Sequence, residues 1–152
     1  MLDRLFSSKK FSDKPLNILI VESNHRDRAF LGRAIEINQP HHQIYVAENL
    51  EQVFSLMYSE VRLDIIFFDI EPTIDLDNLT MIQAITPETI LIHWSKCQHP
   101  EIIELLHEMG INSFCLKDSE PRIILEAIAI SKTNPKFLYL DERLGECLPL
   151  LC

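Results

Sequence analysis

The chain has 152 residues, of which 47% are hydrophobic and 24% charged, and this is the composition of one globular domain rather than of a disordered or collagen-like chain. Its 14 basic and 23 acidic residues give a net charge of −9, which disfavours direct binding to nucleic acid. No apolar run approaches the roughly 20 residues of a membrane-spanning helix and the N-terminus does not resemble a signal peptide, so we expect a cytoplasmic protein without membrane contact.

Short apolar runs predict the strands of a five-stranded sheet. The segments between them carry apolar residues three and four positions apart, which is typical of amphipathic helices. Strands that are apolar on both faces and alternate with helices predict a doubly wound α/β domain, in which a parallel sheet is covered by helices on each side. The predicted strands are residues 16–21, 44–47, 65–70, 90–94 and 113–116.

Capping residues help to place the predicted helices along the chain. Asn49 with Gln52 three positions later, and Ser119 before Pro121, predict helix starts. Gly110 after an apolar helical segment predicts a helix end. The third helix has the weakest apolar pattern. The predicted helices centre on residues 30–35, 50–57, 76–85, 102–109 and 123–128.

Both ends of the chain lie outside this alternation of strands and helices. Residues 1–15 are polar and basic without periodicity, and residues 134–152 follow the last predicted helix after a proline break. We therefore expect an N-terminal extension (1–15), one core domain (16–133) and a C-terminal tail (134–152). The apolar residues 148–151 are interpreted either as a frayed terminus or as a surface for association.

The cysteines and histidines do not form a standard metal motif. His93, Cys97 and His99 can each bind metals and lie within seven residues, but their spacing fits no standard zinc pattern. The cysteines contain no C-x-x-C pair, as expected of reduced thiols in the cytosol. The four cysteines are Cys97, Cys115, Cys147 and Cys152.

Polar side chains stand at the carboxyl ends of the predicted strands. Glu22 and Ser23 follow the first strand, Asp69 lies at the end of the third, Ser95 follows the fourth and Lys117 follows the fifth. In a doubly wound sheet, ligands bind outside the carboxyl ends of the strands. Carboxylates, a hydroxyl and an ammonium together suit an oxyanion and a hard cation such as Mg²⁺. The sequence therefore predicts a phosphoryl-acceptor site at this edge of the sheet.

With these strand ends in order, residues 16–133 resemble the receiver domain of two-component response regulators. The similar segments are ILIVESNHRDRAFLGRAIE, DIIFFDIEP and ILIHWSKCQHPEIIELLHEMGINSFCLKDSEPRIILEAI. The tail residues Leu138 to Asp141 resemble the segment that follows the receiver in regulators with a helix-turn-helix output. The resemblance implies a flavodoxin-like fold with strand order 2-1-3-4-5, and a single-domain response regulator because no output domain follows.

The resemblance implies that Asp69 accepts a phosphoryl group from the phosphohistidine of a partner kinase, giving an aspartyl phosphate in a phosphorelay. Mg²⁺ would lie between Glu22, Asp69 and the backbone carbonyl of Glu71. Ser23 stands where receivers usually carry a second acidic residue, so we expect this metal site to be weaker than usual.

The resemblance also implies a set of residues that respond to the phosphoryl group. Lys117 would pair with its oxygens, Ser95 would be the switch hydroxyl, and Phe114 would be the switch aromatic that turns inward. The face formed by the fourth helix, fifth strand and fifth helix would then change its affinity for partners.

The implied partners are proteins. A sensor histidine kinase or a phosphotransfer protein would supply the phosphoryl group, and a downstream protein would read the result. A homodimer through the fourth helix, fifth strand and fifth helix is a further hypothesis. The chain has three glycines and none of the glycine-rich motifs of nucleotide-binding enzymes, so we expect binding rather than turnover of a metabolite.

A pseudo-receiver is the alternative hypothesis. Lys96 follows the switch hydroxyl, where receivers usually carry a small residue, and the bulky Trp94 precedes it. These residues and Ser23 would blunt the acceptor pocket. The protein would then be a protein-binding module that works without phosphorylation.

Overall fold

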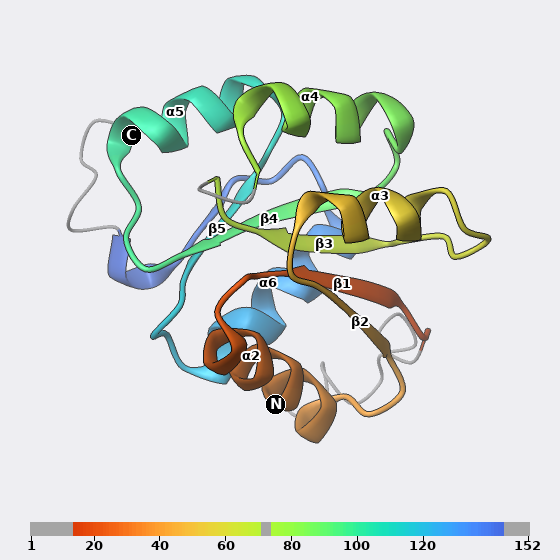
Figure 1. Cartoon of the computed structure of the whole chain (residues 1–152). Helices are drawn as coiled ribbons and strands as arrows, with labels where there is room; N and C mark the ends of the chain where they lie inside the picture. The colour runs from red at the N-terminus through yellow and green to blue at the C-terminus, as the bar shows by residue number, and fades with distance from the viewer. Residues whose placement is uncertain (1–13, 71–73, 145–152) are drawn as a thin grey trace.

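The computed structural model describes residues 14–70 and 74–144. In this part of the chain, one parallel sheet has the strand order β2-β1-β3-β4-β5-β6, and helices cover both of its faces (Figure 1). The strands are β1 (Asn17–Val21), β2 (Gln43–Ala47), β3 (Ile65–Phe68), β4 (Ile90–Ser95), β5 (Ser113–Leu116) and β6 (Tyr139–Leu140). The helices are α2 (His25–Asn38), α3 (Leu50–Met57), α4 (Leu76–Ile85), α5 (Pro100–Glu108), α6 (Pro121–Thr133) and the 3₁₀ turn η2 (Glu142–Leu144).

The prediction of a doubly wound parallel sheet is confirmed, but the predicted number of strands is wrong, because the sheet has six strands rather than five. The additional strand, β6, pairs in parallel with β5. The backbone N–H of Tyr139 donates to the carbonyl of Asn112 at 2.7 Å, and that of Asp141 donates to the carbonyl of Phe114 at 2.9 Å. A strand of two residues is too short to produce an alternating apolar pattern, so the sequence gives no periodic signal for it.

The strands are apolar on both sides because the sheet separates two hydrophobic layers. Along β1, Ile18 and Ile20 face α2 and α6, whereas Leu19 and Val21 face α3, α4 and α5. Figure 1 shows the two helix layers on opposite faces. This alternation decides on which side of the sheet every strand residue lies, including those near the carboxyl edge.

Most of the predicted helix ends are confirmed. The side chain of Asn49 accepts a hydrogen bond from the N–H of Gln52 and begins α3. Gly110 has a φ of 94° just after α5, where glycine is favoured because it has no Cβ. The prediction for Ser119 is wrong, because Glu120 precedes α6 without a side-chain cap and the Ser119 hydroxyl donates to Asp141 instead.

The weak apolar pattern of the third predicted helix reflects how little of it is buried. α4 matches the predicted 76–85, and Leu79 and Ile82 are its buried residues. Its N-terminus is fixed by Asp75, whose side chain accepts from the N–H of Asn78. Among all helices in the described ranges, none is both long and apolar enough to cross a membrane.

Candidate functional site

Lys117 is the centre of a cluster of charged side chains at the carboxyl edge of the sheet. Its Nζ lies 2.5 Å from Oε1 of Glu22, 3.4 Å from Oδ2 of Asp27 and 3.9 Å from Oδ2 of Asp69. These residues come from the ends of β1, β3 and β5 and from the first turn of α2. The structure therefore brings together strand ends that are far apart in the sequence.

The strand register explains why these residues meet. β3 and β4 pair so that Phe68 lies opposite His93, which brings Asp69, one residue later, to the end of the same ladder. β4 and β5 pair with Ser95 opposite Leu116, and the N–H of Lys117 donates to the carbonyl of Ser95 at 2.9 Å. The carboxyl ends of parallel strands stop at the same edge, so their next residues lie close together.

Glu22 is a buried carboxylate that holds two groups in place. It is 7% exposed, and its Oε1 accepts from Lys117 while its Oε2 accepts from the N–H of Asn24 at 3.0 Å. Arg28 donates to the backbone carbonyl of Glu22 at 2.7 Å, which fixes the turn between β1 and α2. Charge-assisted hydrogen bonds of this kind are stronger than neutral ones.

The ammonium of Lys117 is kept charged by its neighbours. Burial lowers its pKa, but the hydrogen bond and charge of Glu22, with the charges of Asp69 and Asp27, outweigh burial and raise the pKa above its ordinary value. The ring of Trp94 adds a cation–π contact, with its centroid 5.0 Å from Nζ. A permanent positive charge therefore stands beside the Asp69 carboxylate.

Asp69 is held as a carboxylate. Burial raises its pKa, but hydrogen bonding and charge from His93, the charge of Lys117 and a hydrogen bond with Ser95 together lower the pKa below its ordinary value of 3.8. The side chain remains 21% exposed. An ionised, accessible oxygen is what attack on a phosphorus atom requires.

His93 is a functional candidate that the sequence analysis considered only as a metal ligand. It is 2% exposed, and its Nε2 lies 3.4 Å from Oδ1 of Asp69. The amide of Gln98 donates to the carbonyls of His93 and Cys115, and the Oε1 of Gln98 lies 2.7 Å from Nδ1 of His93. This pattern assigns a proton to Nδ1 and leaves Nε2 facing Asp69.

Phe114 lies in the core directly behind this histidine. Its side chain is fully buried and its ring centroid is 6.0 Å from that of His93. The ring of Phe68 also packs against the imidazole of His93, with the two ring centroids 5.3 Å apart. Phe114 is therefore a core residue in this structure.

A cavity of about 220 Å³ opens beside Asp69. Ser95, the last residue of β4, is buried and lines it, whereas the exposed Lys96 is not among the described residues that line it. Trp94 belongs to the opposite layer, against α2 and α6, so it does not fill this space. The cavity is lined by Asp69, Ile70, His93, Ser95, Cys97, His99 and Ile102.

The described residues do not form a dedicated metal centre. Within residues 14–70 and 74–144, no three His, Cys, Asp or Glu side chains are grouped so that they could hold a metal ion. Cys97 and His99 contact each other, with Sγ and Nε2 3.6 Å apart. The backbone carbonyl of Glu71, expected as a Mg²⁺ ligand, lies outside the described residues. Glu22 and Asp69 remain as oxygen donors of the kind that Mg²⁺ uses together with water.

Two neighbours of Asp69 and Lys117 were missed, although the sequence contains a signal for each. Alternation along a strand puts residues two apart on one face, so His93 had to share the side of Ser95. Asp27 falls in the first turn of the helix that follows Glu22, where acidic residues are favoured. Asp27 supplies a carboxylate near Lys117 that Ser23 does not.

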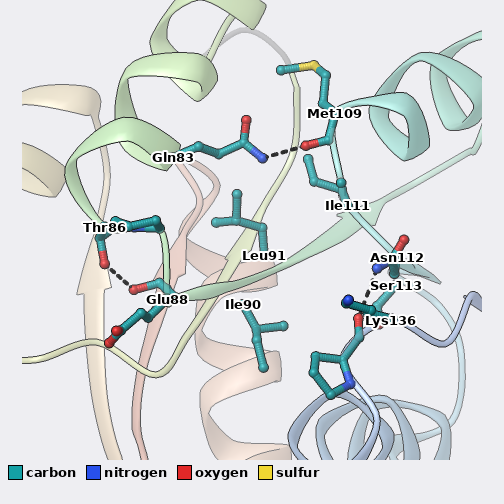
Figure 2. A pocket seen from close by; sticks show the side chains of 14 residues that line it. Gln83, Thr86, Glu88, Ile90, Leu91, Met109, Ile111, Asn112, Ser113 and Lys136 are labelled. Carbon is teal, nitrogen blue, oxygen red and sulfur yellow. Dashed lines mark hydrogen bonds between the residues drawn. The ribbon is translucent and has the colours of Figure 1, made fainter.

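A larger cavity, of about 570 Å³, lies at the opposite edge of the sheet. Figure 2 shows the amide of Gln83 donating to the backbone carbonyl of Met109 above Leu91, a hydrogen bond of 2.9 Å. Its lining comes from α4 and the turn after it, the starts of β4 and β5, the turn after α5 and the turn after α6. Among the described residues, the ionisable groups that line it are Glu88 and Lys136, and Glu88 pairs with Arg62 at the surface. We call it the amino-edge cavity.

Comparison with protein-family models finds no match, and no curated protein matches the sequence. Solved structures do match. A response regulator from Thermotoga maritima superposes with a TM-score of 0.69 at 18% identity, covering 76% of this chain and 96% of that chain. A LuxR family DNA-binding response regulator from Silicibacter pomeroyi gives 0.69 at 19% identity, covering 84% and 98%. The RcsB response regulator of Salmonella typhimurium gives 0.75 at 14% identity, covering 88% and 67%. The chain therefore has the fold of response regulator receiver domains.

Proposed function

We propose that this chain is a response regulator receiver, that Asp69 accepts a phosphoryl group, and that the result is signalled through protein contacts. One observation carries the proposal. At the carboxyl edge of the sheet, the Asp69 carboxylate has the Lys117 ammonium 3.9 Å away, and Ser95 lines the same cavity as Asp69. An acceptor, a cation and a hydroxyl are the groups that phosphoryl transfer to a carboxylate needs.

The proposed reaction is transfer from a phosphohistidine of a partner protein. A carboxylate oxygen of Asp69 attacks phosphorus, the bond between phosphorus and the partner's imidazole nitrogen breaks, and that nitrogen keeps the electron pair and takes a proton. Lys117 would leave Glu22 to pair with the phosphoryl oxygens, and Ser95 would donate to one of them. Phe114 already lies in the core behind them.

Mg²⁺ is the proposed cofactor. Glu22 and Asp69 would hold it, and its charge would offset that of the transferred group. Because Ser23 provides no carboxylate, we propose weak binding of the metal. Asp27, which lies 3.4 Å from Lys117, is the nearest additional acid.

The proposed partners are a sensor histidine kinase or a phosphotransfer protein upstream and a protein target downstream, in the cytoplasm. The net charge of −9 supports protein partners over direct contact with nucleic acid. The proposed role is that of a signalling module rather than an enzyme that turns over a metabolite. We propose a core module of residues 16–144, because β6 lies in the same sheet and Leu144 in the same hydrophobic layer.

Intact-mass spectrometry after incubation with acetyl phosphate tests the acceptor. We expect the wild type to gain one phosphoryl mass, more slowly without Mg²⁺, and Asp69→Asn to gain none. Asp77→Asn is the matched control, because Asp77 is an exposed acid in the first turn of α4, and it should behave as the wild type. Equal labelling of Asp69→Asn and the wild type would exclude Asp69 as the acceptor.

A pseudo-receiver is the second candidate, and the contact between Lys117 and Glu22 favours it. At 2.5 Å this ion pair is shorter than the 3.9 Å between Lys117 and Asp69, so the lysine is satisfied without a phosphoryl group. The protein would then bind its partner in the unmodified state. Loss of partner binding in Asp69→Asn, with the fold intact, would argue against this candidate.

A further inference from the structure

Residues 139–144, which we call the strap, close over the loop that carries Lys117. β6 pairs with β5, and the 3₁₀ turn η2 follows it at once. Leu144 is buried in the same hydrophobic layer as Phe114 and Leu116. The strap is therefore packed into the domain at the edge of the sheet nearest to Lys117.

The carboxylate of Asp141 joins the strap to both sides of that loop. Asp141 is 0% exposed, and its Oδ2 accepts from the N–H of Leu116 at 3.0 Å and from the hydroxyl of Ser119. Its Oδ1 accepts from the N–H of Arg143 at 3.1 Å. A buried carboxylate is stable only while such donors surround it, so these hydrogen bonds form or break together.

A second contact holds Asp118, which lies between Leu116 and Ser119. Nη1 of Arg143 lies 2.6 Å from Oδ1 of Asp118, and this contact lowers the pKa of Asp118. The strap thus binds the residues on either side of Lys117, namely Leu116 and Asp118, as well as Ser119. The side chain of Lys117 points from the loop toward Glu22 and Asp69.

We propose that the strap is the output segment of this protein, and that Asp141 couples it to the position of Lys117. The inference rests on the proposed function, because its input is a phosphoryl group on Asp69. Such a group adds a charge of about −1.5 to −2 and draws Lys117 away from Glu22. The backbone of the loop moves with Lys117, the donors to Asp141 shift, and the strap loosens from β5.

Hydrogen exchange measured by mass spectrometry tests the coupling in the unmodified protein. We expect Asp141→Asn to speed exchange about tenfold both in the strap and at residues 116–119, relative to β3, because a charge-assisted set of hydrogen bonds is lost. Ser119→Ala, a milder variant, should have the same effect to a lesser degree. Glu142→Gln is the control, because Glu142 lies in the strap but pairs at the surface with Arg122 of α6.

The coupling must also run from Lys117 to the strap. Lys117→Met, normalised to β3 to remove global destabilisation, should raise exchange in the strap several-fold. If Asp141→Asn loosens the strap alone, or Lys117→Met leaves the strap unchanged, the coupling is overturned. Neither result depends on phosphorylation.

The last arm combines intact mass with exchange on the same samples treated with acetyl phosphate and Mg²⁺. We expect the phosphorylated wild type to exchange faster in the strap and Asp69→Asn to stay unchanged. A phosphoryl mass without a change in the strap would overturn the inference and leave the proposed function standing. No phosphoryl mass in the wild type would overturn the proposed function, and the inference with it.

Discussion

The two edges of the sheet differ in the volume of their cavities and in the charge of the side chains beside them. The amino edge has the larger cavity, about 570 Å³, but polar side chains such as Gln83 and Asn112 donate there to backbone carbonyls. The carboxyl edge has about 220 Å³, but Asp69 shares it with a buried histidine, and the partly buried ammonium of Lys117 lies beside it. Burying a charged group costs free energy, and such groups cluster at functional sites. Charge therefore identifies the candidate site better than cavity volume does.

The largest effect should come from the same substitution made at both edges. Lys117→Met leaves the carboxylate of Glu22 buried without its cation, and we expect a loss of about 3 kcal/mol in the free energy of unfolding. Lys132→Met removes a partly exposed ion pair, 3.8 Å from Asp64 at the amino edge, and should lose less than about 1 kcal/mol. Urea unfolding at pH 7 measures both, and equal losses would contradict the comparison.

Acid should weaken the two edges in different pH ranges. At the amino edge, Nδ1 of His42 accepts from the N–H of Leu16, and burial, with the charge of His41, lowers the pKa of His42 to about 4 from 6.5. Below pH 6.5, His42 binds a proton in the unfolded chain but not in the folded chain. The free energy of unfolding therefore falls between pH 6.5 and about 4, by on the order of 2 to 3 kcal/mol.

At the carboxyl edge the loss comes at lower pH. The pKa of Asp69 is lowered below 3.8, so its contribution is complete above that value and disappears as the pH falls further. Urea unfolding at a series of pH values, in the wild type and in His42→Gln, separates the two edges. An unchanged slope between pH 6.5 and 4 in His42→Gln would show that another group carries it.

His93→Leu sharpens the description of the carboxyl edge. The variant removes the group that contributes most to lowering the Asp69 pKa, so that pKa should rise. Stability should fall by about 1 to 3 kcal/mol, because a leucine between Phe68 and Phe114 leaves the buried Oε1 of Gln98 without its donor. Carboxyl ¹³C titration by NMR measures the pKa, and a fall would contradict the assignment.

The smallest effect should come from the amino-edge cavity. Gln83→Leu removes the 2.9 Å hydrogen bond to Met109 and should lower stability by about 1 kcal/mol. The rate of phosphoryl gain from acetyl phosphate should stay that of the wild type. A slower rate would mean that the two edges communicate through the sheet.

Most of the fold could be predicted from the sequence because the strands of a doubly wound sheet are apolar on both faces. Residues 65–68 and 113–116 stand out as apolar runs for this reason. The polar residues at the ends of such runs, Glu22, Asp69, Ser95 and Lys117, were therefore predicted to form one site. Glu22, Asp69, Ser95 and Lys117 lie directly at strand ends, where their position follows from the topology, whereas Phe114 lies within β5.

The remaining features depend on contacts that have no periodic signal. β6 is two residues long. The carboxylate of Asp141, which follows it, accepts from Ser119 and Leu116, 22 and 25 residues earlier in the chain. Ser119 has a side chain that commonly caps helices, but its hydroxyl donates to the buried carboxylate of Asp141 instead. Long-range hydrogen bonds of this kind cannot be read from neighbours in sequence.

The position of β6 also limits how this protein can polymerise. With β5 covered, β2 is an outer strand of the sheet in the described part of the chain, and Val46 on it is 55% exposed. An open sheet edge is a template for strands of other molecules, and two such edges would allow a fibre to grow without end. Among the described strands β6 is the other outer strand, and its two residues offer little backbone for a partner strand, so pairing through the longer β2 edge favours a closed pair of copies over a fibre.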